Sequence, residues 1–215
     1  MTCTVGRDKG SRHDLQPLNR AAHGRAGIRI REVTMSRKAL VPIADGTEEL
    51  EAVTIIDVLR RAGTAVTVAS VDGIEVTGSR GTRLKADCLM HECAEATFDL
   101  VALPGGIPGS EHLRDSKELI ALLRRQADAG RPYAAICAAP VVVLQHHGLL
   151  GGRAATCHSS LAAKLENPEA AGQPVVTDGP CTTSRGAGTA MAFALRLVAV
   201  LYGEDKARQV ETALV

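Results

Sequence analysis

The 215-residue sequence predicts an α/β fold in which a mostly parallel sheet is covered by helices on both faces. Short apolar runs alternate with helix-length segments along the chain, and such alternation is typical of parallel strands joined by crossover helices. The runs at residues 100–103 and 132–136 carry almost no polar residue, which favours strands that are buried on both faces. Together these patterns indicate a single layered domain.

The chain supplies the expected elements in a regular order. A first strand at 38–44 leads through a turn into a helix at 48–61, with Thr47 as the expected N-cap. The other predicted strands are 65–70, 100–103, 132–136 and 154–157, with a hairpin made of 175–177 and 181–183, and the other predicted helices are 119–127, 141–146 and 190–202. This order is typical of a flavodoxin-like sandwich.

The composition favours a globular enzyme over a membrane or nucleic-acid-binding protein. Hydrophobic residues make up 45% of the chain, yet no apolar run reaches about eighteen residues, so we expect no transmembrane span. Aromatic residues account for 2% and tryptophan is absent, which disfavours a platform for stacking single-stranded nucleic acid. A net charge of +1 gives no general attraction to nucleic acid or membrane.

The cysteines are scattered through the chain. They are Cys3, Cys88, Cys93, Cys137, Cys157 and Cys181. Cys88 and Cys93 lack a second pair at metal-ligand spacing, so we expect no metal. Because no secretory apolar segment is present, reduced thiols in a cytoplasmic protein are the simpler interpretation. Cys157 is a candidate resolving thiol for an oxidised Cys137, although alternation along a strand would turn it away.

Cys137 lies between the apolar run at 132–136 and the helix expected at 141–146. A tight strand-to-helix turn at this point is a nucleophile elbow, which exposes one side chain above a sheet. Backbone N–H groups at the start of the helix would favour the thiolate. The alternative is a buried cysteine at the end of a core strand, and the local pattern favours neither interpretation.

A glycine-rich loop follows the expected strand at 100–103. Its glycines, Gly105 and Gly106, allow the backbone to approach a ligand closely, so free amides there can face it. Ligands bind at the carboxyl ends of strands in an open parallel sheet, so we expect this loop to meet Cys137 at one crevice. The N–H groups of Gly106 and Ala138 are then the natural oxyanion donors, with Gly105 in the same substrate-binding loop.

Glu51 lies in the first turn of the helix expected at 48–61, where acidic residues are common because they complement the helix dipole. However, Ala52, Ile55 and Leu59 recur at helical spacing and define an apolar face that Glu51 borders. A carboxyl group in that position can be partly buried and protonated, and can donate a hydrogen bond to a thiolate.

Four segments together resemble a known family. They are Ala44–Glu51, Leu103–Gly106, Ala135–Ala138 and Thr183–Thr189. The first three occur in the order and spacing of the ThiJ/PfpI superfamily, and all four are similar to its Parkinson disease deglycase (glyoxalase III-like) branch. The resemblance covers roughly residues 36–215. Protease-like relatives carry histidine where this chain has Ala138, and amidotransferase relatives carry glycine where it has Ala139, so neither of those activities is favoured.

The resemblance implies roles for three residues. Cys137 matches the reactive cysteine, Glu51 matches the protonated glutamate that hydrogen-bonds its sulfur, and His158 aligns with a nearby histidine. A packing role for His158 is equally open, because members vary there. Arg80 and Arg185 match positions where relatives hold an arginine near the pocket or the dimer interface, although exposed arginines in turns are the commoner case.

The function implied by the resemblance is that of a cysteine-dependent, glutathione-independent glyoxalase and deglycase. Its substrates would be 2-oxoaldehydes such as methylglyoxal, and early glycation adducts, and it would act as a homodimer without a cofactor. The alternative is a redox-sensing chaperone in which Cys137 is oxidised and little catalysis occurs. Both interpretations use Cys137 and Glu51, so the sequence does not separate them.

Residues 1–34 differ in kind from the domain expected at 35–215. Basic residues outnumber acidic ones, and no apolar periodicity is present. We expect a disordered extension, with Met35 as the functional start, while a transit peptide is the alternative.

Overall fold

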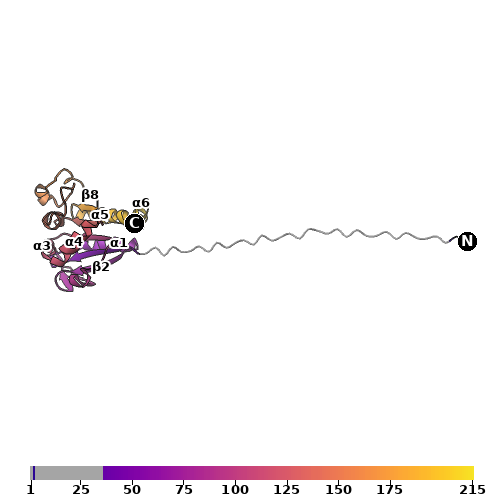
Figure 1. Ribbon diagram of the computed structural model, residues 1–215, viewed down its shortest axis with the longest axis horizontal. Helices are drawn as coiled ribbons and strands as arrows, with labels where there is room; N and C mark the ends of the chain where they lie inside the picture. Colours follow the sequence, from indigo (N-terminus) through magenta and orange to yellow (C-terminus); the bar gives the residue numbers. More distant parts are fainter. Residues whose placement is uncertain (1, 3–35) are drawn as a thin grey trace. The chain divides into compact units, whose positions relative to one another are not determined.

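Seven strands form one sheet in the order β5-β2-β1-β6-β7-β9-β8 in the computed structural model, which describes Thr2 and residues 36–215 (Figure 1). These strands are β1 (Lys38–Ile43), β2 (Ala65–Ser70), β5 (Cys88–Leu89), β6 (Leu100–Leu103), β7 (Tyr133–Ile136), β8 (Val175–Asp178) and β9 (Cys181–Ser184). All neighbours pair in parallel except β8 and β9, which form an antiparallel hairpin. The predicted α/β class with a mostly parallel, flavodoxin-like sheet is confirmed.

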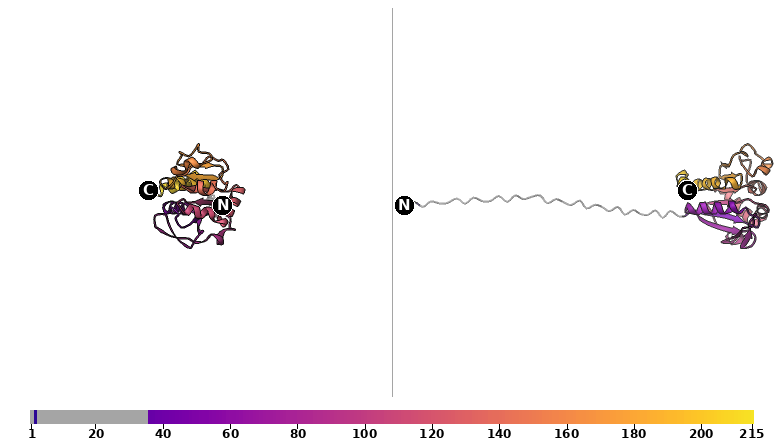
Figure 2. Two further views of the ribbon diagram at one scale, coloured as in Figure 1. Left: turned by 90° about the vertical axis from the view of Figure 1, so that its left-hand side faces the viewer. Right: turned by 180° about the vertical axis from the view of Figure 1, so that it is seen from behind.

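Helices cover both faces of the sheet. The α-helices are α1 (Glu49–Arg61), α2 (Met90–Cys93), α3 (Gly109–Asp115), α4 (Lys117–Asp128), α5 (Ala190–Tyr202) and α6 (Glu204–Thr212), and the tighter or wider turns are η1 (a π-helix, Pro140–Gln145), η2 (3₁₀, Ser159–Lys164) and η3 (3₁₀, Ala187–Thr189). One face packs against α1, α5 and α6, and the other against α2, α3, α4 and η1. Figure 2 shows α5, in yellow, beside α1.

The central strands supply the core because their side chains alternate between two buried faces. Val41 and Ile43 of β1 join the cluster that contains Ile55 of α1, whereas Leu40 joins the cluster that contains Leu123 of α4. All of these side chains are buried. Continuous apolar runs are therefore what this doubly covered sheet requires.

The expected N-cap of the first helix is wrong. Helix α1 starts one residue after Glu48, and Thr47 does not cap it. Instead, Oγ1 of Thr47 accepts a hydrogen bond of 2.9 Å from the N–H of Ala44. Thr47 therefore closes the turn back onto β1, and its side chain is no longer free to bind the first helical N–H groups.

The strand expected at 154–157 is also wrong, because β9 is already paired on both edges by β7 and β8. The segment runs past the sheet and uses side-chain acceptors instead. The N–H of Ala154 donates to Oδ2 of Asp178 and that of Thr156 to Oγ1 of Thr183, both over 2.9 Å. This segment delivers His158 to the carboxyl ends of the strands.

The sequence patterns did not predict the antiparallel hairpin of β3 (Glu75–Thr77) and β4 (Arg83–Lys85). Helices α2, α3 and α6 and strand β5 were also missed. The hairpin is tied to the turn before α1, because the N–H of Gly46 donates to the carbonyl of Thr77 and that of Ser79 to the carbonyl of Thr47. Its tip therefore lies next to the start of α1.

Within the described residues, no helix is both long enough and apolar enough to cross a bilayer. The predictions for residues 1–34, including the disordered extension, lie outside the described part of the chain apart from Thr2.

Candidate active site

Cys137 directly follows β7 and has a φ of 65°, the only positive φ at a non-glycine position among the described residues. Its backbone is held from both sides. Its N–H donates to the carbonyl of Ser184 over 3.0 Å, and its carbonyl accepts from the N–H of His158 over 2.8 Å. A side chain in the left-handed region is uncommon and needs such support. This geometry is that of the nucleophile elbow expected from the sequence.

Glu51 projects from the first turn of α1 beneath this elbow and is fully buried. Its Oε2 accepts a hydrogen bond of 2.8 Å from the N–H of Gly105, and the carboxyl group interacts with the Cys137 thiol. Among the described residues, Oε1 has no hydrogen-bond partner. A buried carboxyl oxygen without a donor is costly when the group is ionised, which favours the protonated acid.

Both groups have raised pKa values, so each holds its proton more tightly than usual. Burial raises the pKa of Glu51 to about 7, against the opposing effect of the Gly105 N–H. Burial and the charge of Glu51 raise the pKa of Cys137 to about 12, and the N–H groups of Gly106 and Ala138 only partly offset this. The sequence had led us to expect that the backbone amides would favour a thiolate, but the amides alone do not lower the pKa of Cys137 enough. A thiolate at neutral pH therefore requires that the thiol proton pass to Glu51.

The two glycines after β6 have different tasks. A Cβ added at Gly105 would lie 2.5 Å from Cβ of Cys137 and 2.9 Å from Oε2 of Glu51, so glycine lets the pair approach each other. The N–H of Gly105 is already donated to Glu51 and is not available to a substrate. Gly106 instead presents its N–H to Cys137, as Ala138 does. The expected oxyanion donors therefore reduce to Gly106 and Ala138.

His158 reaches the same crevice from the residue before η2. Its Nδ1 lies 2.8 Å from Oγ of Ser160 and accepts the N–H of Ser160 over 3.3 Å. A Cβ added at Gly186 would lie 3.6 Å from Cδ2 of His158 and 3.7 Å from Sγ of Cys137. Gly186 thus leaves open the space between the imidazole and the sulfur. Sequence reasoning matched the segment that contains Gly186 to the family but gave the glycine no task.

A cavity of about 540 Å³ opens above Cys137. Its lining consists of Glu48, Ser79, Arg80, Gly106, Ile107, Glu111, Cys137, Ala138, Val142, His158, Ser160, Leu161 and Lys164. Of the predicted site residues, Cys137, His158, Gly106 and Ala138 line this cavity, whereas Glu51 and Gly105 lie beneath it. Sequence reasoning missed most of the polar rim, because the β3–β4 hairpin and η2 that supply much of it carry no strong periodic signal.

Glu49 holds one side of this rim in place. Its carboxylate accepts hydrogen bonds from the N–H groups of Arg80 at 3.0 Å and Thr82 at 3.2 Å, and from the hydroxyl of Ser79 at 3.2 Å. Burial alone would raise the pKa of Glu49, but backbone N–H donors outweigh it and lower the pKa to about 2. Arg80, which the sequence left open as a surface or pocket residue, reaches the cavity and lies 3.9 Å from Glu48.

Cys157 is unsuited to the resolving role considered from the sequence. It is fully buried and packs in the cluster that contains α4, whereas Cys137 packs against the cluster on the opposite face. Burial raises the pKa of Cys157 to about 11. Among the described residues, no group of three or more His, Cys, Asp or Glu side chains is placed to hold a metal ion.

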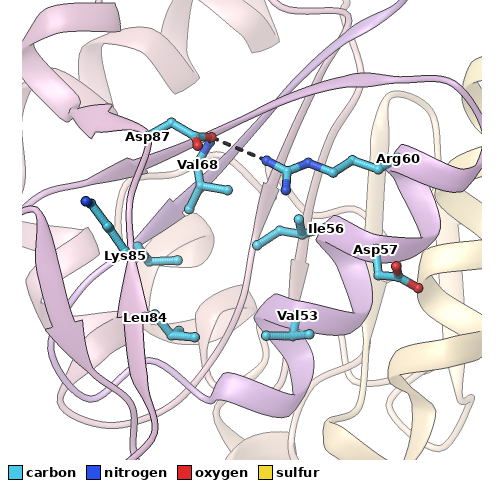
Figure 3. Close-up of a pocket in the computed structure, with 9 residues that line it drawn as sticks. Val53, Ile56, Asp57, Arg60, Val68, Leu84, Lys85 and Asp87 are labelled. Carbon is cyan, nitrogen blue, oxygen red and sulfur yellow. Dashed lines mark hydrogen bonds and ion pairs between the residues drawn. The ribbon is translucent and has the colours of Figure 1, made fainter.

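A second cavity, of about 340 Å³, lies between α1, β2 and β4 (Figure 3). Val53, Ile56 and Leu84 give it apolar walls, and an Arg60–Asp87 ion pair of 3.4 Å crosses one end (Figure 3). None of the residues that line it is a cysteine, serine or histidine. The chemistry of the molecule therefore concentrates in the cavity above Cys137.

The fold and the site together define a class: α/β proteins with a cysteine on an elbow at the carboxyl end of the sheet, backed by a buried glutamate. The chain belongs to the DJ-1/PfpI family, whose model matches residues 37–200. This membership confirms the resemblance seen in the sequence.

Curated relatives support the same family. Protein DJ-1 homolog B of Arabidopsis thaliana is 45% identical over 175 residues, which cover 81% of this chain but only 40% of that relative. Protein dj-1beta of Drosophila melanogaster is 43% identical over 183 residues, covering 84% of this chain and 97% of the relative. The glutathione-independent glyoxalase DJR-1.2 of Caenorhabditis elegans is 35% identical over 169 residues, covering 78% and 89%.

A solved structure gives the same result in three dimensions. Oxidized DJ-1 of Toxoplasma gondii superimposes with a TM-score of 0.81 at 43% identity, covering 83% of this chain and 98% of that one. The flavodoxin-like architecture is therefore common to this chain and its relatives.

Proposed function

We propose that this protein is a glutathione-independent glyoxalase that converts 2-oxoaldehydes such as methylglyoxal into 2-hydroxy acids. The observation that carries this proposal is the buried carboxyl of Glu51, which interacts with the elbow thiol of Cys137. The name of the C. elegans relative, a glutathione-independent glyoxalase, supports the same reaction class.

The first step is addition of the thiol to the aldehyde. The proton of Cys137 passes to Glu51, and Sγ attacks the aldehyde carbon. The C–S bond forms as the C=O π bond breaks, and its electron pair moves to the oxygen. The N–H groups of Gly106 and Ala138, which face Cys137, stabilise this oxygen until it takes up a proton as a hemithioacetal.

The second step moves hydrogen between the two carbons of the substrate. A base removes the proton from the carbon bonded to sulfur, and a proton returns to the neighbouring carbon, which leaves a thioester of lactate on Cys137. Water then cleaves the thioester and restores the thiol. The sum is methylglyoxal plus water to lactate, so no external oxidant or reductant is consumed. Glu51 interacts with the Cys137 thiol and His158 lines the cavity above it, so these two are the candidates to move the proton.

Deglycation is the same chemistry on a larger substrate. An early glycation adduct would place its aldehyde-derived carbon at Cys137 and leave its amino-acid part in the cavity of about 540 Å³. This volume exceeds what a three-carbon aldehyde fills, which favours acceptance of larger adducts. Release of the free amine from a purified adduct, with a scavenger present that removes free methylglyoxal, distinguishes direct deglycation from aldehyde trapping.

A redox-sensing chaperone is the second candidate, and the half-exposed position of Cys137 favours it. Peroxide would oxidise the thiolate first to a sulfenate and then, with a second equivalent, to a sulfinate, releasing water at each step. The protonated Glu51 and the Gly106 and Ala138 amides would bind the sulfinate oxygens. The solved T. gondii relative is described as oxidized, which is consistent with oxidation within this family.

We further propose that two copies of the chain pair through the outer side of α1. Leu50 and Val53 on this helix are 51% and 49% exposed, which is high for large apolar side chains. Val53 also borders the apolar cavity in Figure 3, so the exposed surface and the hollow are continuous. Sedimentation of wild type should give a dimer and Val53→Asp a monomer, whereas a monomeric wild type would contradict pairing.

The test of function is lactate formation from methylglyoxal by metal-free protein without glutathione. Wild type should turn over, Cys137→Ser should lose activity by at least about 100-fold, and Cys157→Ser should keep it. No turnover by wild type would exclude the glyoxalase proposal. Mass spectrometry of Cys137 after peroxide would then test the redox candidate.

A further inference from the structure

The imidazole of His158 is held by the residue two positions along the chain. Ser160 directs both of its donors at Nδ1: the hydroxyl lies 2.8 Å from this nitrogen, and the backbone N–H donates to it over 3.3 Å. His158 is also the N-cap of η2, so this contact fixes the ring to the start of that helix.

The backbone donor decides which nitrogen carries the proton. An amide N–H can only donate, so Nδ1 must present its lone pair to it. In the neutral imidazole the remaining proton then lies on Nε2. The Ser160 hydroxyl, which is free to rotate, adds a second donor to the same lone pair.

The Cδ2 side of the ring, which Nε2 shares, and the sulfur of Cys137 both border the space at Gly186. Cδ2, the carbon bonded to Nε2, lies on the side of Gly186, where an added Cβ would be 3.6 Å from Cδ2 and 3.7 Å from Sγ of Cys137. His158 and Ser160 both line the cavity above Cys137. From these two observations we infer that Nε2–H reaches the part of the cavity that a substrate bonded to Sγ would occupy.

We propose that Ser160 is a positioning residue that holds His158 as the Nε2–H tautomer, so that His158 donates a hydrogen bond to the substrate oxygen and does not act as the base. This inference rests on the proposed glyoxalase function. The C–S bond forms as before, and the electron pair that moves to the oxygen is stabilised by Nε2–H together with the Gly106 and Ala138 amides. Glu51, which received the thiol proton, passes it to the substrate oxygen and, once ionised again, removes the carbon-bound proton.

The tautomer can be measured without any substrate. In protein labelled with ¹⁵N-histidine, the two ring nitrogens of His158 have distinct chemical shifts, and His158→Asn identifies its signals by their loss. Near pH 8 we expect a protonated Nε2 and an unprotonated Nδ1. A proton on Nδ1 would overturn the proposal, whether or not the protein turns over methylglyoxal.

The positioning role is tested by kinetics. Ser160→Ala removes the hydroxyl but keeps the backbone donor, so we expect kcat to fall about tenfold with KM little changed. Ser160→Thr restores a hydroxyl and should recover most of kcat. Ser159→Ala is the matched control, because the neighbouring serine makes no hydrogen bond to the ring within the described residues, and it should behave as wild type.

A double-mutant cycle separates positioning from a general structural effect. If Ser160 acts through the imidazole, Ser160→Ala should have no further effect in the His158→Asn background, where asparagine still caps η2. An equal loss in both backgrounds would overturn the positioning role. An inactive wild type would instead contradict the proposed function, and the ¹⁵N shifts would still decide the tautomer.

Discussion

The N–H of Gly105 donates a hydrogen bond of 2.8 Å to Oε2 of Glu51, joining the loop after β6 to the first turn of α1 directly beneath Cys137. One backbone amide therefore orients the carboxyl that interacts with the thiol. The contact is possible because Gly105 has no side chain, and this makes the glycine part of the machinery that places the acid.

The approach of Glu51 to Cys137 should not tolerate a methyl group at Gly105. An added Cβ would lie 2.5 Å from Cβ of Cys137, which is backbone-proximal and cannot swing away. We expect Gly105→Ala to lower kcat/KM at least about 100-fold and to reduce stability. Gly188→Ala is the control, since an added Cβ there meets no atom within 4 Å. Similar kinetics for both variants would show that a methyl group at position 105 does not disturb the contact between Glu51 and Cys137.

Glu51 should make the protein less stable at higher pH. Its folded pKa is about 7, above its ordinary value of 4.5, so the contribution of the protonated acid is complete below about pH 4.5 and is lost as pH rises through 7. Glu51→Gln should therefore be more stable than wild type at pH 8, by on the order of 3 kcal/mol, with a smaller gain at pH 5. Urea unfolding at both values measures this, and a gain independent of pH would contradict it.

The backbone at Cys137 should be relieved by glycine. With φ at 65°, a residue with Cβ is strained at this position, by roughly 1–2 kcal/mol. Cys137→Gly and Cys137→Ala both remove the thiol, but only glycine removes the strain. Glycine loses more backbone entropy on folding than alanine, which offsets part of the relieved strain. We still expect the free energy of unfolding to be about 1 kcal/mol higher for the glycine variant, which should unfold at a higher urea concentration. A more stable alanine variant would mean that the elbow is relaxed.

Glu49 should protect the cavity rim against acid only while it is ionised. Its folded pKa of about 2 lies below its ordinary value of 4.5, so its contribution is present above about pH 4.5 and is lost as pH falls toward 2. Glu49→Gln should lower stability at pH 7 and flatten its decline below pH 4.5. Glu75→Gln, on an exposed position of the same hairpin, is the control and should follow the wild-type curve.

The sequence predicted those elements whose stability lies in their own apolar pattern. Strands β1, β2 and β6 are apolar runs that a doubly covered sheet requires, and helix α5 was predicted over its full length, 190–202. The β3–β4 hairpin has no such pattern. Its tip depends on Glu49, about thirty positions away in the chain, and a local pattern does not report that contact.

The site shows the same difference between residues that a local pattern reveals and residues whose role depends on distant contacts. Cys137 and Glu51 were found because each breaks an apolar pattern with a reactive group, and family motifs reinforced both. Gly186 contributes empty space, and Ser160 contributes two donors whose value depends on where His158 lies. The strand wrongly expected at 154–157 shows the same limit of local patterns. Its apolar residues are compatible with a strand, but both edges of β9 are already paired, with β7 and with β8.

The order β1-β6-β7-β9 brings residues as far apart as 51 and 186 to one point. Each of these four central strands, or the loop or helix that follows it, contributes a group to the site, so no short segment of the chain contains the site by itself. Parallel pairing between segments that are distant in the chain is slow. Helix formation alone creates none of the geometry around Cys137. On dilution from denaturant, enzymatic activity should therefore return with the last folding phase, after most of the helical signal has recovered.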